Sequence, residues 1–326
     1  MGEPRRIVRA KVRLIATLVM ATMTVTTLSA VAGDPGSAGA MTANPKLTAS
    51  TQPLAHASKP APSRLMYGVT LDDVSRVDRV AAILDRLGRR VTVRIVFDEG
   101  QPPSAYRYAV NRLAPRADIV GQILDSSAMR TVTVAQYADR TRRYLAAFGA
   151  KVKIWEIGNE VNGEWLGSTR SVVAKISVAY DLVKAAGRSA ALTTYFNPDC
   201  WERPSHEMFR WLNTNVPVRM KRGLDYVFVS YYEGDCNNYR PASWTPVFRQ
   251  LRKLFTTSAL GFGEVGMSDP ARPRTVAKAR SLMAYYYRVR PAVPGFVGGW
   301  FWWYGAQDIF GPAPALLSTF RAVIRT

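Results

Sequence analysis

Ile154-Trp155-Glu156-Ile157-Gly158-Asn159-Glu160 is a short apolar run that ends in a carboxylate. Its β-branched and aromatic residues, closed by Gly158, are typical of a buried parallel strand. A second run, Leu260-Gly261-Phe262-Gly263-Glu264, also ends in a glutamate. Carboxylates are rarely placed beside a hydrophobic core, so the glutamates that end these two runs are candidates for a functional site.

Similar apolar runs recur along the chain from residue 65 onward. They cover residues 65–69, 91–97, 118–124, 152–158, 191–195, 226–232, 259–265 and 296–303. Longer amphipathic stretches separate them, and these have helical spacing. They cover residues 72–87, 134–148, 171–186, 244–255 and 275–287, with shorter pieces at 104–113, 205–213 and 315–324. The first helix is expected to begin with Asp72-Asp73 as its N-cap and to stop at Gly88.

Eight strands, each followed by a helix, in about 260 residues predict an α/β fold of the (β/α)8 TIM barrel type. A doubly wound open sheet also alternates strands and helices, and it stays as the alternative. The first strand-to-helix turn, residues 67–72, lacks the glycine fingerprint of a dinucleotide site. The sequence also lacks a phosphate-binding G-x-x-x-x-G-K-[ST] loop.

Composition excludes several classes of site. Hydrophobic residues make up 48% and charged residues 21%, as in an ordinary globular protein. With only two histidines and two cysteines, a zinc site of three histidines and an iron–sulfur cluster lack ligands. We therefore expect no metal site and no cofactor. The net charge of +20 favours acidic partners, but no block of like charge follows residue 32, so we expect no nucleic-acid partner.

The N-terminus has the layout of a secretory signal. Residues 1–13 are basic, residues 14–28 are apolar or small, and Ala30-Val31-Ala32 precedes Gly33. We expect a signal peptide at residues 1–32, a disordered linker at 33–62 and a single domain at 63–326. An uncleaved membrane anchor is the alternative. If the signal peptide is removed, we expect the protein to be secreted or associated with the cell wall. We also expect it to be monomeric and without stable membrane insertion.

Export also predicts the state of the cysteines. Cys200 and Cys236 each follow a predicted strand closely. Two cysteines in an oxidising compartment usually pair, so we expect a disulfide between two loops. Two separate thiols are the alternative.

The chemistry follows from where barrels place reactive groups. Strand C-terminal ends form the mouth of the barrel, and strands four and seven lie across it from one another. Glu160 and Glu264 at these ends can flank a bound sugar. Hydrolysis of a glycosidic bond needs such a pair, one group to protonate the leaving oxygen and one to attack or to activate water.

Together, Asn159-Glu160 on strand four, Glu264 on strand seven and Gly299-Trp300-Phe301-Trp302-Trp303 on strand eight resemble clan-A retaining glycoside hydrolases, a superfamily of cellulases, galactanases and xylosidases. The resemblance covers about residues 65–326. It implies that Glu160 is the general acid/base and Glu264 the nucleophile, with no metal or organic cofactor.

The resemblance also implies a set of substrate-binding residues. Asn159 corresponds to the residue that binds the sugar 2-hydroxyl, Arg94 to an arginine beside the nucleophile, and Tyr232 to the strand-six tyrosine. Trp302 or Trp303 would provide the aromatic surface on which the sugar stacks, since strand alternation permits only one of them to face inward. Tyr231 and Trp165 complete the expected substrate-binding set.

Two positions depart from the clan's pattern. Ser230 stands where many members have a histidine two residues before the strand-six tyrosine, and Gln122 stands near strand three, where histidines are common. This puts family membership and substrate in doubt. Glu156, which has the strand parity of Glu160, is expected to pair with Arg94.

We therefore expect a secreted glycosidase that cleaves an oligo- or polysaccharide with retention of configuration. A catalytically inactive carbohydrate-binding barrel and a transglycosylase that uses the same two glutamates are the alternatives. The sequence does not identify the sugar.

Overall fold

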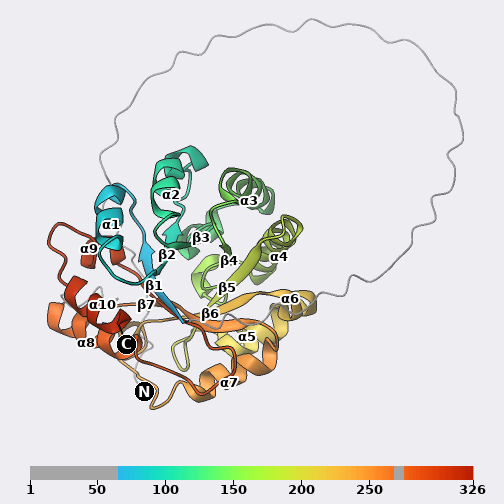
Figure 1. Ribbon diagram of the computed structural model, residues 1–326. Coiled ribbons are helices and arrows are strands. Elements are labelled where there is room, and N and C mark those ends of the chain that lie inside the picture. Colours follow the sequence, from blue (N-terminus) through green and yellow to red (C-terminus); the bar gives the residue numbers. More distant parts are fainter. Residues whose placement is uncertain (1–64, 268–274, 326) are drawn as a thin grey trace, which may run out of the picture. The chain divides into compact units, whose positions relative to one another are not determined.

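The computed structural model describes residues 65–267 and 275–325. The predicted signal peptide at 1–32 and linker at 33–62 lie outside these residues. Eight parallel strands form a closed barrel in the order β1-β2-β3-β4-β5-β6-β7-β8, which confirms the TIM barrel and excludes the open sheet (Figure 1). The strands are β1 Met66–Leu71, β2 Thr92–Val96, β3 Asp118–Gln122, β4 Ile154–Gly158, β5 Ser189–Tyr195, β6 Tyr226–Tyr231, β7 Ala259–Val265 and β8 Gly298–Trp302.

Helices surround the barrel (Figure 1). They are α1 Val77–Leu84, α2 Arg107–Leu113, α3 Val134–Phe148, α4 Thr169–Ala185, α5 Met208–Asn215, α6 Val218–Gly223, α7 Thr245–Leu254, α8 Val276–Tyr286, α9 Gly305–Asp308 and α10 Leu317–Ile324. Within the residues just defined, no helix is both long and apolar enough to cross a bilayer.

The start of the first helix differs from the expectation. Helix α1 begins at Val77, and Arg76 before it makes no side-chain cap. Asp73 instead accepts a hydrogen bond from the amide of Ser75 at 2.7 Å, which closes a local turn. Aspartate stabilises such turns as readily as helix starts, so the Asp72-Asp73 pair did not fix the boundary. Asp72 is thereby left at the end of β1.

The character of the side chains inside the barrel changes along the strands. An apolar layer at the N-terminal ends of the strands includes Ile154, Phe228 and Phe301. Buried polar side chains, among them Arg94 and Glu156, lie further along the strands. The remaining apolar residues of the strands pack outward against the helices in the main core, so they fix the barrel without filling its mouth.

A small cluster of Val96, Tyr232 and Trp303 lies at the C-terminal ends of β2, β6 and β8. Tyr304 packs against it. These residues line the mouth, where barrels carry their active sites. The carboxylates singled out in the sequence lie at the same end of the strands.

Candidate active site

Glu264 is fully buried at the end of β7, and three donors hold it. Its Oε1 accepts hydrogen bonds from Arg94 Nη2 at 3.0 Å and from Asn159 Nδ2 at 2.6 Å. Its Oε2 accepts from the hydroxyl of Tyr232 at 2.7 Å. Donors of this number and charge favour the ionised carboxylate, and they fix its orientation.

A bulge turns Glu264 toward this centre. Along β6 and β7, Val229 is paired with Phe262 but Ser230 is paired with Glu264, so Gly263 is the extra residue. Phe262 packs outward, and in an unbroken strand Glu264 would share its face. A Cβ on Gly263 would lie 2.7 Å from Thr193 Cγ2, so this bulge accommodates only glycine.

Glu160 is also fully buried, and two neutral hydroxyls donate hydrogen bonds to it. Ser230 Oγ donates to Oε1 at 2.6 Å and Ser126 Oγ donates to Oε2 at 2.9 Å. The indole of Trp165 in turn donates to Ser126 Oγ at 3.1 Å. A hydroxyl can donate to a carboxylate and accept from a carboxylic acid, so this setting suits a group that changes protonation state.

The backbone just after β4 directs the adjacent side chains of Asn159 and Glu160 into the same site. The register between β4 and β5 shifts after Glu156, and Asn159 follows on the inner side. Glu160 has a left-handed backbone, φ 49°, and its carbonyl accepts from the amide of Gly163 at 2.7 Å. Such a backbone costs about 1–3 kcal/mol and tends to persist where the fold requires it, often at functional sites.

Arg94 links two carboxylates beneath the mouth. Its Nε and Nη2 donate to Glu156 at 2.5 and 2.8 Å, in addition to the bond to Glu264. Burial acts to lower the pKa of Arg94, but the charges of Glu156 and Glu264 outweigh it and raise the pKa above its ordinary value. Glu156 therefore pairs with Arg94, and Arg94 serves both carboxylates.

Trp302, the last residue of β8, and Trp303, the residue after it, face opposite ways. The ring of Trp303 lies in the mouth with the guanidinium of Arg94 5.5 Å from its centroid. Trp302 packs in the outer core, and its indole donates to Asp308 at 2.8 Å. Trp303 is therefore the inward residue of the pair.

Tyr231 and Trp165 lie apart from the nucleophile candidate. Tyr231 packs outward against Phe196 and Trp244, and its hydroxyl donates to the carbonyl of Tyr239. Strand alternation places it on the face opposite Tyr232. The structure thus does not bring Tyr231 or Trp302 to the carboxylates, whereas Trp165 reaches Glu160 through Ser126.

Two residues at the mouth were not expected from the sequence. Ser126 had no signal beyond its place after the third strand. Asp72 lies at the end of β1, and its Oδ2 accepts from Gln307 at 3.1 Å while Oδ1 is buried without a hydrogen bond. Burial raises the pKa of Asp72 from 3.8 to about 6, only partly offset by the bond from Gln307.

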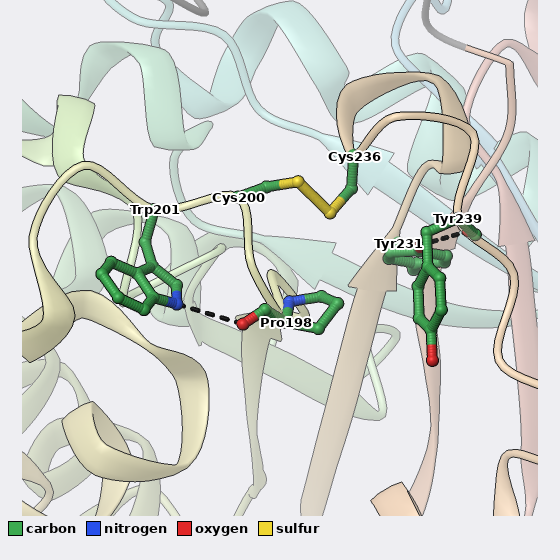
Figure 2. The surroundings of a disulfide bond; sticks show 6 residues. All are labelled: Pro198, Cys200, Trp201, Tyr231, Cys236 and Tyr239. Atoms are coloured by element: carbon green, nitrogen blue, oxygen red, sulfur yellow. Dashed lines mark hydrogen bonds between the residues drawn. A yellow bond between two sulfur atoms is a disulfide. The ribbon is translucent and has the colours of Figure 1, made fainter. Parts of the chain in front are cut away.

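The predicted disulfide between Cys200 and Cys236 is present (Figure 2). It joins the segment after β5 to the segment after β6, both at the mouth. Close by, the indole of Trp201 donates to the carbonyl of Pro198 at 3.1 Å, and Tyr231 bonds Tyr239 (Figure 2). The bridge therefore ties together two loops that frame the mouth.

Metal ligands are not grouped in this part of the chain. Across residues 65–267 and 275–325, no three His, Cys, Asp or Glu side chains are arranged to hold an ion.

Comparison with known proteins places the fold. No family model matches the chain, and neither does any curated protein sequence. Among solved structures, a GH5-4 broad specificity endoglucanase from an uncultured bacterium is 12% identical, with a TM-score of 0.53 over 78% of this chain and 85% of that one. A GH5_18 variant from Streptomyces cattleya, in complex with Manb1-4GlcNAc, is 16% identical, with a TM-score of 0.50 over 74% and 71%. The chain has the barrel fold of these GH5 proteins.

Proposed function

We propose that the protein is a retaining glycoside hydrolase in which Glu264 is the nucleophile and Glu160 the general acid/base. The observation that carries the proposal is the contrast between two buried glutamates at one barrel mouth. Glu264 is held by a guanidinium, an amide and a phenol, whereas Glu160 is held by two hydroxyls. In glycoside hydrolases, the surroundings of two carboxyl groups determine which one acts as the acid and which one acts as the nucleophile.

In the first step Glu264 attacks the anomeric carbon while Glu160 donates its proton to the leaving oxygen. A glycosyl-enzyme ester forms and the glycosidic bond breaks. In the second step Glu160 takes a proton from water, which displaces Glu264 and restores both groups. The hydrogen bonds from Arg94, Asn159 and Tyr232 orient Glu264 for this attack.

The substrate would contact two further groups. Asn159 Oδ1 is buried without a hydrogen bond within the protein, while its Nδ2 is committed to Glu264. This oxygen can accept a hydrogen bond from a sugar hydroxyl next to the reacting carbon. Trp303 provides an aromatic face at the mouth, and its neighbour Arg94 fixes it from one side. A glycan, an oligo- or polysaccharide, is the substrate class that these groups fit.

The test is release of reducing sugar from a panel of β-linked polysaccharides. Glu264→Gln keeps the shape of the side chain and removes the nucleophile, so we expect activity to fall roughly a thousandfold or more. The matched control is Asp199→Asn, which changes an exposed carboxylate after β5 and should leave activity as in the wild type. Equal activity of Glu264→Gln and wild type would refute the assignment.

Two other outcomes separate the alternatives. Products longer than the substrate would indicate a transglycosylase. Binding of a glycan without any turnover by the wild type would indicate an inactive carbohydrate-binding barrel.

A further inference from the structure

Exposed cations gather at the end of the barrel opposite the mouth. We call this end the barrel floor and define it as the helix-to-strand connections, each with the last turn of the helix before it. Of the seven connections between α1 and β8, six carry an exposed lysine or arginine in the described part of the chain. Representatives of the six are Arg86, Lys151, Arg188, Arg222, Lys253 and Arg288.

The few carboxylates at the barrel floor are already neutralised. Asp85 pairs with Arg116 at 3.0 Å, and Asp225 pairs with Lys184 at 2.8 Å. Asp118 pairs with both Arg90 and Lys153, at 3.1 and 2.7 Å. The representative cations named above do not enter these pairs, so their charge faces solvent.

The mouth has the opposite character within the described residues. The strand-to-helix side carries carboxylates on most of its segments, among them Asp72, Asp98, Asp125, Glu164, Asp235 and Asp308. Helix dipoles favour this division, since the helix C-termini lie at the floor. That effect ends within the last helical turn, yet Lys151 and Arg188 each stand three residues beyond their helix. Helix stability therefore does not account for all of the charge at the floor.

The N-terminal segment joins the barrel at this same end. Strand β1 begins at Met66, and strands begin at the floor. The preceding sequence holds a basic stretch at residues 1–13 and an apolar stretch at 14–28, the pattern of a segment addressed to a membrane. The chain therefore enters the barrel at the floor, the end that also carries the exposed cations.

We propose that the barrel floor binds the surface of an anionic phospholipid bilayer and holds the mouth away from it. Each lysine or arginine near an anionic bilayer strengthens binding about fivefold, and the attraction decays over roughly 10 Å at 0.1 M salt. The cations come from six separate connections rather than one helix or groove. A bilayer presents phosphates over the whole face at once, whereas a nucleic acid duplex presents them along two strands. The binding is peripheral and does not depend on the proposed catalytic function.

The experiment is co-sedimentation of residues 33–326, the chain expected once the signal peptide is removed, with vesicles of phosphatidylcholine, with and without phosphatidylglycerol. The floor variant is Arg86→Gln, Arg188→Gln, Lys253→Gln and Arg288→Gln. The matched control removes the same charge at the mouth end, with Arg76→Gln, Arg107→Gln, Arg170→Gln and Arg210→Gln. None of these side chains forms a salt bridge within the described residues, so both variants should melt close to the wild type.

We expect the floor variant to bind phosphatidylglycerol vesicles at least tenfold more weakly than the wild type, and the control to bind within about twofold of it. If both variants bound the vesicles equally weakly, the proposal would be overturned, because binding would then depend on the net charge of the protein and not on where the cations lie. Tighter binding of the wild type to duplex DNA than to the vesicles at equal salt would also overturn it, in favour of a nucleic acid partner.

A measurement on the wild type does not depend on the variants. Hydrogen exchange with vesicles present should protect the connections at residues 85–91, 149–153 and 186–188. Protection confined to the mouth would contradict the proposal.

Discussion

At the scale of single residues, the site depends on how differently two buried glutamates are held. Glu264 receives a charged donor and two neutral ones, and Glu160 receives two serine hydroxyls. Ser230, which departs from the clan's usual histidine, proves to be a partner of Glu160. A departure that put the family in doubt is thus compatible with the proposed acid/base role, because a hydroxyl can serve both protonation states.

Ser230→Ala should lower kcat/KM about tenfold through kcat, because it removes one of the two hydroxyls that position Glu160. The loss should be large for a glycoside with a poor leaving group and small for a nitrophenyl glycoside, which needs little protonation. The measurement is the ratio of kcat/KM values for the two substrates.

The control for this variant is Ser258→Ala. Ser258 is equally buried and donates to the carbonyl of Leu224 at 2.7 Å, outside the mouth. It should cost stability but leave the ratio unchanged. A ratio that stays constant in Ser230→Ala as well would show that Ser230 has only a structural role.

Asp72 makes the folded protein sensitive to pH. Its pKa is raised from 3.8 to about 6, so its ionised form is disfavoured in the folded state. Below pH 3.8 the carboxyl group is protonated in both the folded and the unfolded protein, so it does not lower the free energy of unfolding. As the pH rises from 3.8 to 6 the cost grows, and above 6 it is complete.

Asp72→Asn should therefore raise the free energy of unfolding by about 1–3 kcal/mol near pH 8 and by about zero near pH 3.5. Asparagine keeps an oxygen for the bond from Gln307. Denaturant unfolding at the two pH values measures the difference. A gain of equal size at both would mean that ionisation is not its cause.

At the scale of elements, the alternation of apolar runs was enough to predict eight strands and most of the helices between them, but not the short helices α6 and α9. The ends of β4 and β7 were not predictable in the same way. Period-two alternation does not reveal a bulge, and the bulge at Gly263 decides that Glu264 faces inward. The start of α1 was misjudged because Asp73 stabilises a turn instead of capping the helix.

The Cys200–Cys236 disulfide is the link between two mouth loops, and it closes 36 residues of chain. Loop-closure entropy predicts a contribution of roughly 3–4 kcal/mol to stability. The double variant Cys200→Ala and Cys236→Ala should melt well below the oxidised wild type. Under a thiol reductant the two proteins should melt together, and identical melting without reductant would contradict a stabilising role.

At the scale of the whole molecule, the sequence predicted the barrel class because the count and length of the units leave few alternatives. It also placed Arg94, Asn159, Glu160, Tyr232 and Glu264 near one another, since strand ends converge at one mouth. It did not place Ser126 or Asp72, and it could not separate Trp302 from Trp303. Those positions depend on loop paths and strand parity, which are set by tertiary packing.

The structure shows where the residues behind the net charge of +20 lie on the barrel. The sequence shows no block of like charge after residue 32. In the described residues the cations concentrate at the floor and the carboxylates at the mouth. A protein of basic net charge can thus have a barrel mouth rich in carboxylates.

The most direct test of the central claim is covalent trapping of Glu264. The wild type would be treated with a 2-deoxy-2-fluoro glycoside of the sugar found active in the panel, and the labelled peptide identified by mass spectrometry. The 2-fluoro group slows hydrolysis of the glycosyl-enzyme, so the ester accumulates. We predict one adduct per chain, on the peptide that contains Glu264. An adduct on another carboxylate, or turnover that gives the inverted anomer, would contradict the assignment of Glu264 as the nucleophile.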